Sequence, residues 1–287
     1  MNQFEDSWNL LRLATFLMVA VLGVTSATAL AAPKASQPEP QGQNLTPLQL
    51  EIEKQRQRLS SLEAEERRDA LMRLGALRHP AASRAAASAL SDSSPIVRAT
   101  AAGSLLALPA EESVAALLPL LGDRDEFVRQ QIAYALGRSG SRTATAPLIE
   151  RLTDKQDSVR GAAAVALGQI GDPAGVTALA AVLSPQSALL PNRKGQKSKA
   201  KQNPFVLRAA ARSLGQIRDR AALPALIAVL ENEQADADVR REAALALGTI
   251  GDSAALPALR SALTATDPYL SQAAHLAVRK LANAPGS

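Results

Sequence analysis

One pattern of apolar and polar positions recurs along most of the chain. Its clearest copy spans residues 154–172, where an acidic turn precedes a Val-Arg pair and an alanine-rich run that ends in Leu-Gly. The anchor valine recurs as Val97, Val128 and Val159, and each step is 31 residues long. The same register continues at four further anchors, Glu66, Val206, Val239 and Leu270. A fixed period of this size predicts a stacked array of seven repeats.

Each repeat is predicted to contain two helices. In the first helix, apolar residues recur at three- and four-residue spacing along one helical face, as in residues 114–121, 222–230 and 255–263. The second helix is the run from the anchor to Leu-Gly. In the turn between them, Asp92, Asp123 and Asp154 are suited to capping the second helix. Neither helix can bury its apolar face alone, so the pattern predicts an all-α solenoid.

A glycine stands nine residues after the anchor in five of the seven copies. We expect this glycine to lie near the C-terminus of the second helix, where a left-handed residue is often needed. Aromatic residues make up only 2% of the chain, so the core is predicted to consist of Ala, Leu, Val and Ile. The five glycines are Gly75, Gly137, Gly168, Gly215 and Gly248.

The repeat resembles HEAT repeats, and most closely the short bacterial form called HEAT-like in phycobilin lyases. The motif D-x-x-x-x-V-R-x-x-A-x-x-A-L-G is written here as Asp154, Val159, Arg160, Ala163, Ala166, Leu167 and Gly168. The resemblance covers about residues 63–282 and implies an armadillo-like α-solenoid, a fold that carries many unrelated functions. It also implies a structural ladder between neighbouring repeats, formed by Asp92, Arg98, Asp123, Arg129, Asp154, Arg160 and Arg240.

The first 32 residues lie outside the repeats. A 12-residue apolar run from Leu13 to Val24 leads to Ala29-Leu30-Ala31, a pattern typical of a cleaved secretory signal peptide. We therefore expect a periplasmic or extracellular protein. An uncleaved membrane anchor is the alternative, although the run is too short to span a bilayer comfortably.

The region between the signal and the repeats has two parts. Residues 33–47 are rich in Pro and Gln and are predicted to be a disordered linker. In residues 48–62, four apolar side chains fall on one helical face, which predicts a helix that caps the first repeat. A coiled-coil dimerisation helix is the alternative, but the apolar seam is short for that role. Residues 283–287 form a polar tail.

One repeat carries an insertion at residues 184–204. It contains five basic residues and no acid, and their charge equals the net charge of +5 of the whole chain. The insertion is either a solvated loop or an arm for an anionic surface or polymer. It lacks aromatic residues for base stacking, which argues against nucleic acid. The candidate partner-binding residues in and after it are Arg193, Lys194, Lys197, Lys199, Lys201, Arg208, Arg212 and Arg241.

The sequence offers little for catalysis. The two histidines, His79 and His275, lie in the first and last repeats, and the chain has no cysteine. We therefore expect no cofactor, no metal site and no enzyme activity. The favoured function is a scaffold that binds a protein partner on its curved helical surface. The alternatives are a chromophore-attaching lyase that resembles the phycobilin lyases, and an electrostatic binder that uses the insertion.

Overall fold

The computed structural model describes residues 45–184 and 203–283. These residues form seven helix pairs and no strand, as the repeat pattern predicts. The first helices of the pairs are α1 (Pro47–Arg58), α3 (Pro80–Ala87), α5 (Ala110–Leu117), α7 (Thr145–Arg151), α9 (Val176–Leu183), α11 (Leu223–Glu231) and α13 (Leu256–Ser261). The second helices are α2 (Ala64–Ala76), α4 (Pro95–Gly103), α6 (Glu126–Ser139), α8 (Asp157–Ile170), α10 (Pro204–Ile217), α12 (Ala237–Ile250) and α14 (Pro268–Ala282).

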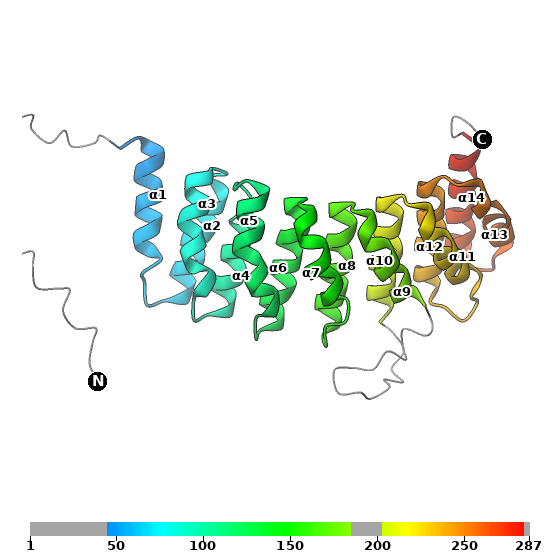
Figure 1. Cartoon of the computed structure of the whole chain (residues 1–287), viewed down its shortest axis with the longest axis horizontal. Helices are drawn as coiled ribbons and strands as arrows, with labels where there is room; N and C mark the ends of the chain where they lie inside the picture. Colours follow the sequence, from blue (N-terminus) through cyan, green and yellow to red (C-terminus); the bar gives the residue numbers. More distant parts are fainter. Residues whose placement is uncertain (1–44, 185–202, 284–287) are drawn as a thin grey trace, which may run out of the picture. The chain divides into compact units, whose positions relative to one another are not determined.

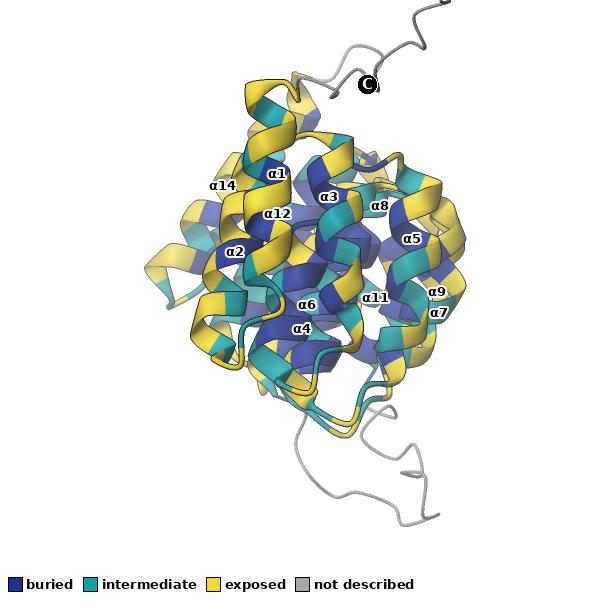
Figure 2. Cartoon of the chain, turned by 90° about the vertical axis from the view of Figure 1, so that its left-hand side faces the viewer, coloured by how far each residue is buried: buried dark blue, intermediate teal, exposed yellow. Residues whose placement is uncertain are grey.

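The pairs of this all-α solenoid follow one another in chain order (Figure 1). Each second helix packs against the second helices of the neighbouring repeats and against the first helices beside it. Buried residues therefore concentrate between the two rows of helices, and exposed residues lie on their outer sides (Figure 2). The predicted signal peptide, the tail from residue 284 onward and residues 185–202 of the insertion lie outside the described residues.

The helix predicted to cap the array is α1, which also serves as the first helix of the first repeat. It begins with a capping box in which Thr46 Oγ1 accepts the Gln49 N–H and Gln49 Oε1 accepts the Thr46 N–H. Ile52 is buried against the first repeat, which the apolar spacing predicts. The helix ends at Arg58 rather than near residue 62, and Leu62 is 97% exposed in the following turn.

The glycine nine residues after the anchor does not end the second helix, so that prediction is wrong. Gly168 lies inside α8, and a Cβ placed on it would stand 2.7 Å from the Cβ of Ser213 on α10. Gly248 faces Ala277 of the next repeat in the same way, at 2.6 Å. The glycine is required because neighbouring second helices touch at this position, where a side chain has no room.

The residue that ends the second helix stands three positions later. Gly140, Gly171 and Gly251 occupy it with φ between 68° and 79° and form the left-handed C-caps of α6, α8 and α12. In α10 the same position is Arg218, whose φ is 61°. In each of these repeats, the residue nine positions after the anchor therefore makes the close helix contact, and the residue three positions later ends the helix.

The contact position can be tested with Gly137→Ala. The new Cβ would stand 2.6 Å from the Cα of Ala166, so we expect a loss of about 1–3 kcal/mol of stability from overpacking. Gly103→Ala is the matched control, since an added Cβ there meets nothing within 4 Å. The control should gain up to about 1 kcal/mol from helix propensity. Urea unfolding of both variants measures the difference, and equal effects would contradict the close contact.

Candidate functional site

A ladder of ion pairs joins the repeats beneath the surface. Nε and Nη2 of Arg98 donate to Oδ2 and Oδ1 of Asp123, both at 2.8 Å, across a gap of 25 residues. Nη1 of the same arginine donates to the carbonyl oxygens of Asp92 and Ser93 in its own turn, at 2.9 and 3.1 Å. Each such arginine thus holds its own interhelical turn and the turn of the next repeat. The same arrangement links Arg129 to Asp154 and Arg67 to Asp92.

Burial and hydrogen bonding act in opposite directions on the ladder carboxylates. The side chains of Arg129 and Asp154 are each only 6% exposed. Burial raises the pKa of Asp154, but the hydrogen bonds from Arg129 and from the Gln156 N–H outweigh it, so the pKa lies below its ordinary value of 3.8. The same balance lowers the pKa of Asp123. For Asp92 the bond with Arg67 is the largest influence and lowers its pKa.

The ladder aspartates do not cap the second helices as the sequence suggested. Asp123 Oδ1 accepts the N–H of Asp125, two residues later, and Asp125 is the N-cap of α6. Asp154 likewise accepts the N–H of Gln156, the N-cap residue of α8. The carboxylates shape the turn before the helix and bind arginine with their remaining lone pairs.

Within the described residues, two predicted members of the ladder bind only inside their own repeat. Arg160 donates to the Asp154 carbonyl oxygen and pairs with Asp157. The turn it would reach 25 residues later lies outside the described residues. Arg240 donates to the Leu230 carbonyl oxygen at 3.0 Å, and the residue 25 positions after it is alanine. Arg67 belongs to the ladder although it was not predicted, and its position directly after the anchor Glu66 was the available signal.

The arginines predicted to bind an anionic partner are paired with acids. Arg212 makes a bidentate pair with Glu242, at 3.0 and 2.8 Å, and Arg208 lies 3.1 Å from Asp238. Arg241 binds Asp238 as well, at 3.0 Å. Asp238 thus serves both Arg208 and Arg241, and Arg241 also lies 3.7 Å from Asp267, so each of these arginines has an acid partner among the described residues. The remaining predicted residues of this set lie outside the described residues, namely Arg193, Lys194, Lys197, Lys199 and Lys201.

The aromatic side chains of the described residues gather on the solvent side of the second helices. We call Phe127, Tyr134, Phe205 and Tyr269 the aromatic face. Phe127, Phe205 and Tyr269 precede their anchors by one residue and are 41%, 42% and 63% exposed. Tyr134 is half-buried and lies seven residues after Phe127, two turns along the same face of α6. None of these four rings is fully buried, although Tyr134 packs against the edge of the core.

Neighbouring repeats interlock along this face. With positions counted from the anchors, the residue at position −1 of one repeat lies against the residue at position +2 of the preceding repeat. The Phe205 ring lies over Gly161, where a Cβ would overlap it, and the Arg241 guanidinium lies 5.0 Å from the centroid of the Tyr269 ring. A second contact joins position +6 of one repeat to position +3 of the next, as in the Arg212–Glu242 pair. The rings are therefore held by backbone or cation beneath them and remain open to solvent above.

On α4, α6 and α8, the rows of these contacts carry no side chain that is charged at neutral pH. We define the central strip as positions −1, +2, +3 and +6, counted from the anchors, on α4, α6 and α8. Three of its residues are buried, Ala99, Gly161 and Ala162, and Gly103 is exposed. Its open side chains are Ile96, Thr100, Phe127, Gln130, Gln131, Tyr134, Ser158 and Val165. The same rows carry Arg–acid pairs on α10 and α12, so the strip is uncharged beside a charged but compensated region.

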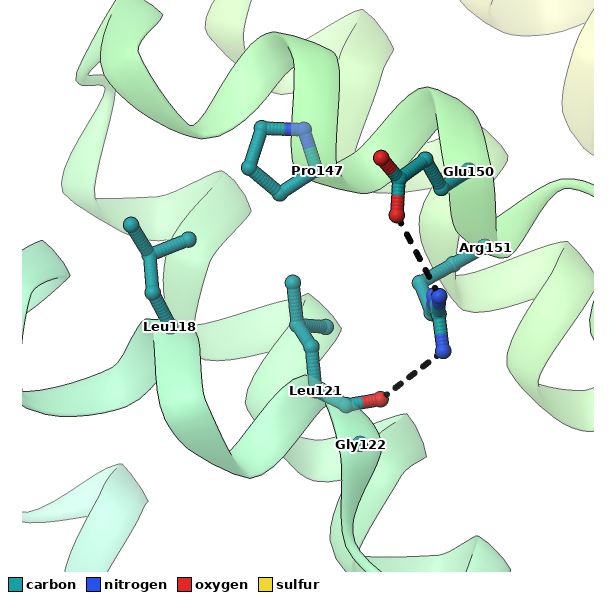
Figure 3. A pocket seen from close by; sticks show the side chains of 6 residues that line it. All are labelled: Leu118, Leu121, Gly122, Pro147, Glu150 and Arg151. Carbon is teal, nitrogen blue, oxygen red and sulfur yellow. Dashed lines mark hydrogen bonds and ion pairs between the residues drawn. The ribbon is translucent and has the colours of Figure 1, made fainter.

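The hollows of the structure lie elsewhere. One hollow of 210 Å³ opens between α7 and the short helix η2 (Leu118–Gly122), and Arg151 borders it by donating to the Leu121 carbonyl oxygen (Figure 3). Another of 440 Å³ is lined by Arg58, Asp69, Met72 and Arg73. The lining of neither includes a histidine or serine that could act as a base or nucleophile.

Neither of the two histidines lines either hollow. His79 Nδ1 accepts the N–H of Ala81 and caps α3, and His275 is exposed on α14. Within residues 45–184 and 203–283, no group of three or more His, Asp or Glu side chains is arranged to hold a metal ion. No helix in this part of the chain is long and apolar enough to cross a membrane.

Comparison with known proteins identifies the repeat. The family model for HEAT repeats matches residues 52–137, 115–190 and 196–279. The chain belongs to the HEAT-repeat family. Two features described above recur between the repeats of this chain, namely the ladder of the turns and the close contact of the second helices. No curated protein matches this HEAT-repeat chain.

Solved structures share its fold at low sequence identity. YibA of Escherichia coli is 20% identical over 82% of each chain, with a TM-score of 0.56. The CpcE–CpcF complex of phycocyanin lyase from Nostoc is 24% identical over 88% of this chain and 92% of that one, with a TM-score of 0.47. Human deoxyhypusine hydroxylase is 21% identical over 81% and 85%, with a TM-score of 0.41. At these identities the likeness concerns the fold alone.

The ladder can be tested with Arg129→Met, which leaves the buried Asp154 carboxylate without its bidentate partner. We expect a loss of about 3–5 kcal/mol of unfolding free energy. The matched control is Arg84→Met, because Arg84 and Glu112 also join two repeats bidentately but are 56% and 41% exposed. The control should lose far less stability, because water and salt screen this exposed pair. Similar losses in denaturant unfolding would show that burial of the ladder does not matter.

The ladder also predicts acid sensitivity. Because the folded-state pKa values of Asp92, Asp123 and Asp154 lie below 3.8, their stabilisation is complete above that value and is lost as the pH falls through the folded values. Urea midpoints should therefore be constant above about pH 5 and fall steeply below about pH 4. Asp123→Asn should be less stable at neutral pH and show a shallower acid decline. An unchanged acid slope in this variant would contradict the assignment.

Proposed function

We propose that this HEAT-repeat protein is a non-catalytic scaffold that binds a protein partner on its aromatic face. The observation that carries the proposal is the placement of Phe127, Tyr134, Phe205 and Tyr269 on the solvent side of three second helices, α6, α10 and α14. The exposed surface of aromatic side chains in such a row is in unfavourable contact with water and adds nothing to the packing of the core. They contribute favourably when a partner covers them, and aromatic residues are enriched among the residues that dominate binding energy.

The support beneath the rings favours a pre-formed binding surface. Phe205 rests on the backbone at Gly161, and Tyr269 rests on Arg241, so both rings are oriented before any partner arrives. The buried ladder joins the repeat that carries both Phe127 and Tyr134 to its two neighbours. Rigid side chains on a rigid scaffold lose little conformational entropy on binding. The repeat architecture thus supports recognition by a surface rather than by an enclosed pocket.

The proposal includes export to the periplasm or the cell exterior. Its support is the N-terminal sequence, in which an apolar run ends before a small-x-small cleavage pattern at Ala29 to Ala31. A mature chain that begins near Ala32 is the expected product. N-terminal sequencing of the protein from its host tests this, and an intact Met1 in the cytosolic fraction would contradict it.

The binding surface is tested by comparing partner capture by matched double variants. Phe127→Ala with Phe205→Ala removes two rings from the aromatic face. The control is Leu50→Ala with Leu62→Ala, since these leucines are 56% and 97% exposed but lie on and after α1. Proteins crosslinked to the wild-type chain in its host should be recovered at least about ten-fold less with the first double variant, because each lost aromatic anchor costs about 1–2 kcal/mol or more.

The control variant should recover the same proteins at wild-type yield. Thermal melts of both variants must first show that the array remains folded. Equal recovery by the wild type and the aromatic variant would overturn the proposed surface. Loss in both variants would instead point to exposed apolar residues in general and not to the aromatic face.

A further inference from the structure

We propose that the central strip binds an extended, uncharged polypeptide segment in the polyproline II conformation, with an apolar side chain at every third residue. The inference rests on the proposed scaffold function and names the chemistry of the partner. It is carried by three properties of the strip, which are its lack of charge, its unused hydrogen-bonding groups and the spacing of its helices.

The charge of the strip selects against a charged contact segment. None of its side chains on α4, α6 and α8 is charged at neutral pH, whereas Arg208, Arg212 and Arg241 in the following repeats already have acid partners. A charged partner side chain buried against Phe127 or Tyr134 would lose its hydration without gaining an opposite charge. An uncharged segment meets no such cost, so the strip complements neutral, apolar sequence.

The polar groups of the strip select for an exposed backbone. Among the described residues, the side-chain amides of Gln130 and Gln131 and the hydroxyl of Tyr134 have no hydrogen-bond partner within the protein. A side-chain amide offers a donor and an acceptor side by side, as a peptide group does. A helical partner would already use its backbone groups internally, whereas a polyproline II segment leaves its carbonyl oxygens free. The strip therefore fits an extended chain better than a helix.

The strip also has room for a partner side chain. Gly103 stands at position +6 of its repeat, and a Cβ added there meets nothing within 4 Å. By the register of the Arg212–Glu242 pair, its neighbour in the next repeat is Gln131 at position +3. In the row at position −1, Ile96 lies on one side of Phe127 and Ser158 on the other. An apolar side chain placed over Gly103 would thus lie beside a free amide that can bind its backbone.

The spacing of the repeats fits three residues of such a chain. Packed helices lie about 8–10 Å apart. A polyproline II helix has three residues per turn and rises about 3.1 Å per residue, so equivalent side chains recur about every 9 Å. A segment that crosses α4, α6 and α8 would therefore present one apolar side chain to each repeat. In a β-strand, residues three apart point to opposite faces, so only alternate members of such a series would reach the strip.

The experiment measures binding of labelled, capped peptides of about twelve residues to the full chain by fluorescence anisotropy. The probe carries leucine at every third position and proline elsewhere. Its controls are a peptide of the same composition with the leucines grouped at one end, the spaced peptide with lysine in place of leucine, an alanine-rich helical peptide with leucines on one face, and chitohexaose as a neutral glycan. The spaced leucine peptide should bind at least ten-fold more tightly than each control.

Matched protein variants locate the site. Gln130→Leu and Gln131→Leu should each weaken binding about five-fold, the effect of one lost neutral hydrogen bond. Gln272→Leu is the control, because Gln272 holds the same row as Gln130 but lies on α14, outside the strip. Phe127→Ala should weaken binding at least ten-fold, and melts should show all variants folded.

Failure of this inference is distinguishable from failure of the scaffold proposal. Tighter binding of the helical peptide, the lysine peptide or chitohexaose, no binding of the spaced peptide, or an equal effect of Gln272→Leu would each overturn the inference. The capture of host proteins by the aromatic face would stand in any of these cases. If the wild type and the aromatic double variant recovered host proteins equally while the spaced peptide still bound, only the scaffold proposal would be overturned.

Discussion

The close contact between neighbouring second helices is the constraint on which this structure depends. Where glycine at position +9 faces alanine or serine at position +7 of the next repeat, the helix backbones touch with no side chain between them. Such contact gains dispersion over many atoms and leaves no space for substitution. Two repeats lack this glycine. Leu106 holds its position in the second repeat, but α4 has already ended at Gly103, so Leu106 lies in a turn and is 43% exposed. Arg279 holds it on α14, which no described helix follows.

The ladder adds direction to this packing. Glycine contact alone is apolar and tolerates sliding, whereas the bidentate pair between Arg98 and Asp123 has one geometry. The pairs at Arg98 and Arg129 are almost fully buried, while Arg212 in the C-terminal repeats is 60% exposed and meets Glu242. Exposed pairs are screened by water and salt, so each contributes little to stability. Removing one partner of a buried pair costs much more stability, because the other charge is left buried without a partner. The N-terminal and C-terminal repeats therefore share one helix packing but rely on different polar links.

The close packing of the second helices explains why the core contains so few aromatic residues. A core whose helices approach this closely is filled by alanine, leucine and valine, and bulky rings would separate the helices. The four rings of the described residues stand instead on the solvent side, supported by Gly161, by Arg241 or by neighbouring small residues. The same closeness that excludes rings from the core provides a flat, firm base for rings on the surface. Stability and the proposed recognition thus depend on one packing geometry.

The sequence by itself determined the repeat, its register and the all-helical architecture, because these follow from local periodicity over 31 residues. It also indicated that arginines and aspartates at repeated positions form a ladder, with Arg98, Asp123, Arg129 and Asp154 among them. The partner of each arginine, 25 residues away, and the different bonding of Arg240 depend on contacts between elements that are distant in sequence. The role of Gly168 required the tertiary structure as well, since a glycine near a helix end is compatible with both a left-handed cap and a helix contact. Only the position of α10 against α8 decided between them. Steric exclusion acts between segments that are distant in sequence, so the local sequence pattern does not show why the glycine is needed.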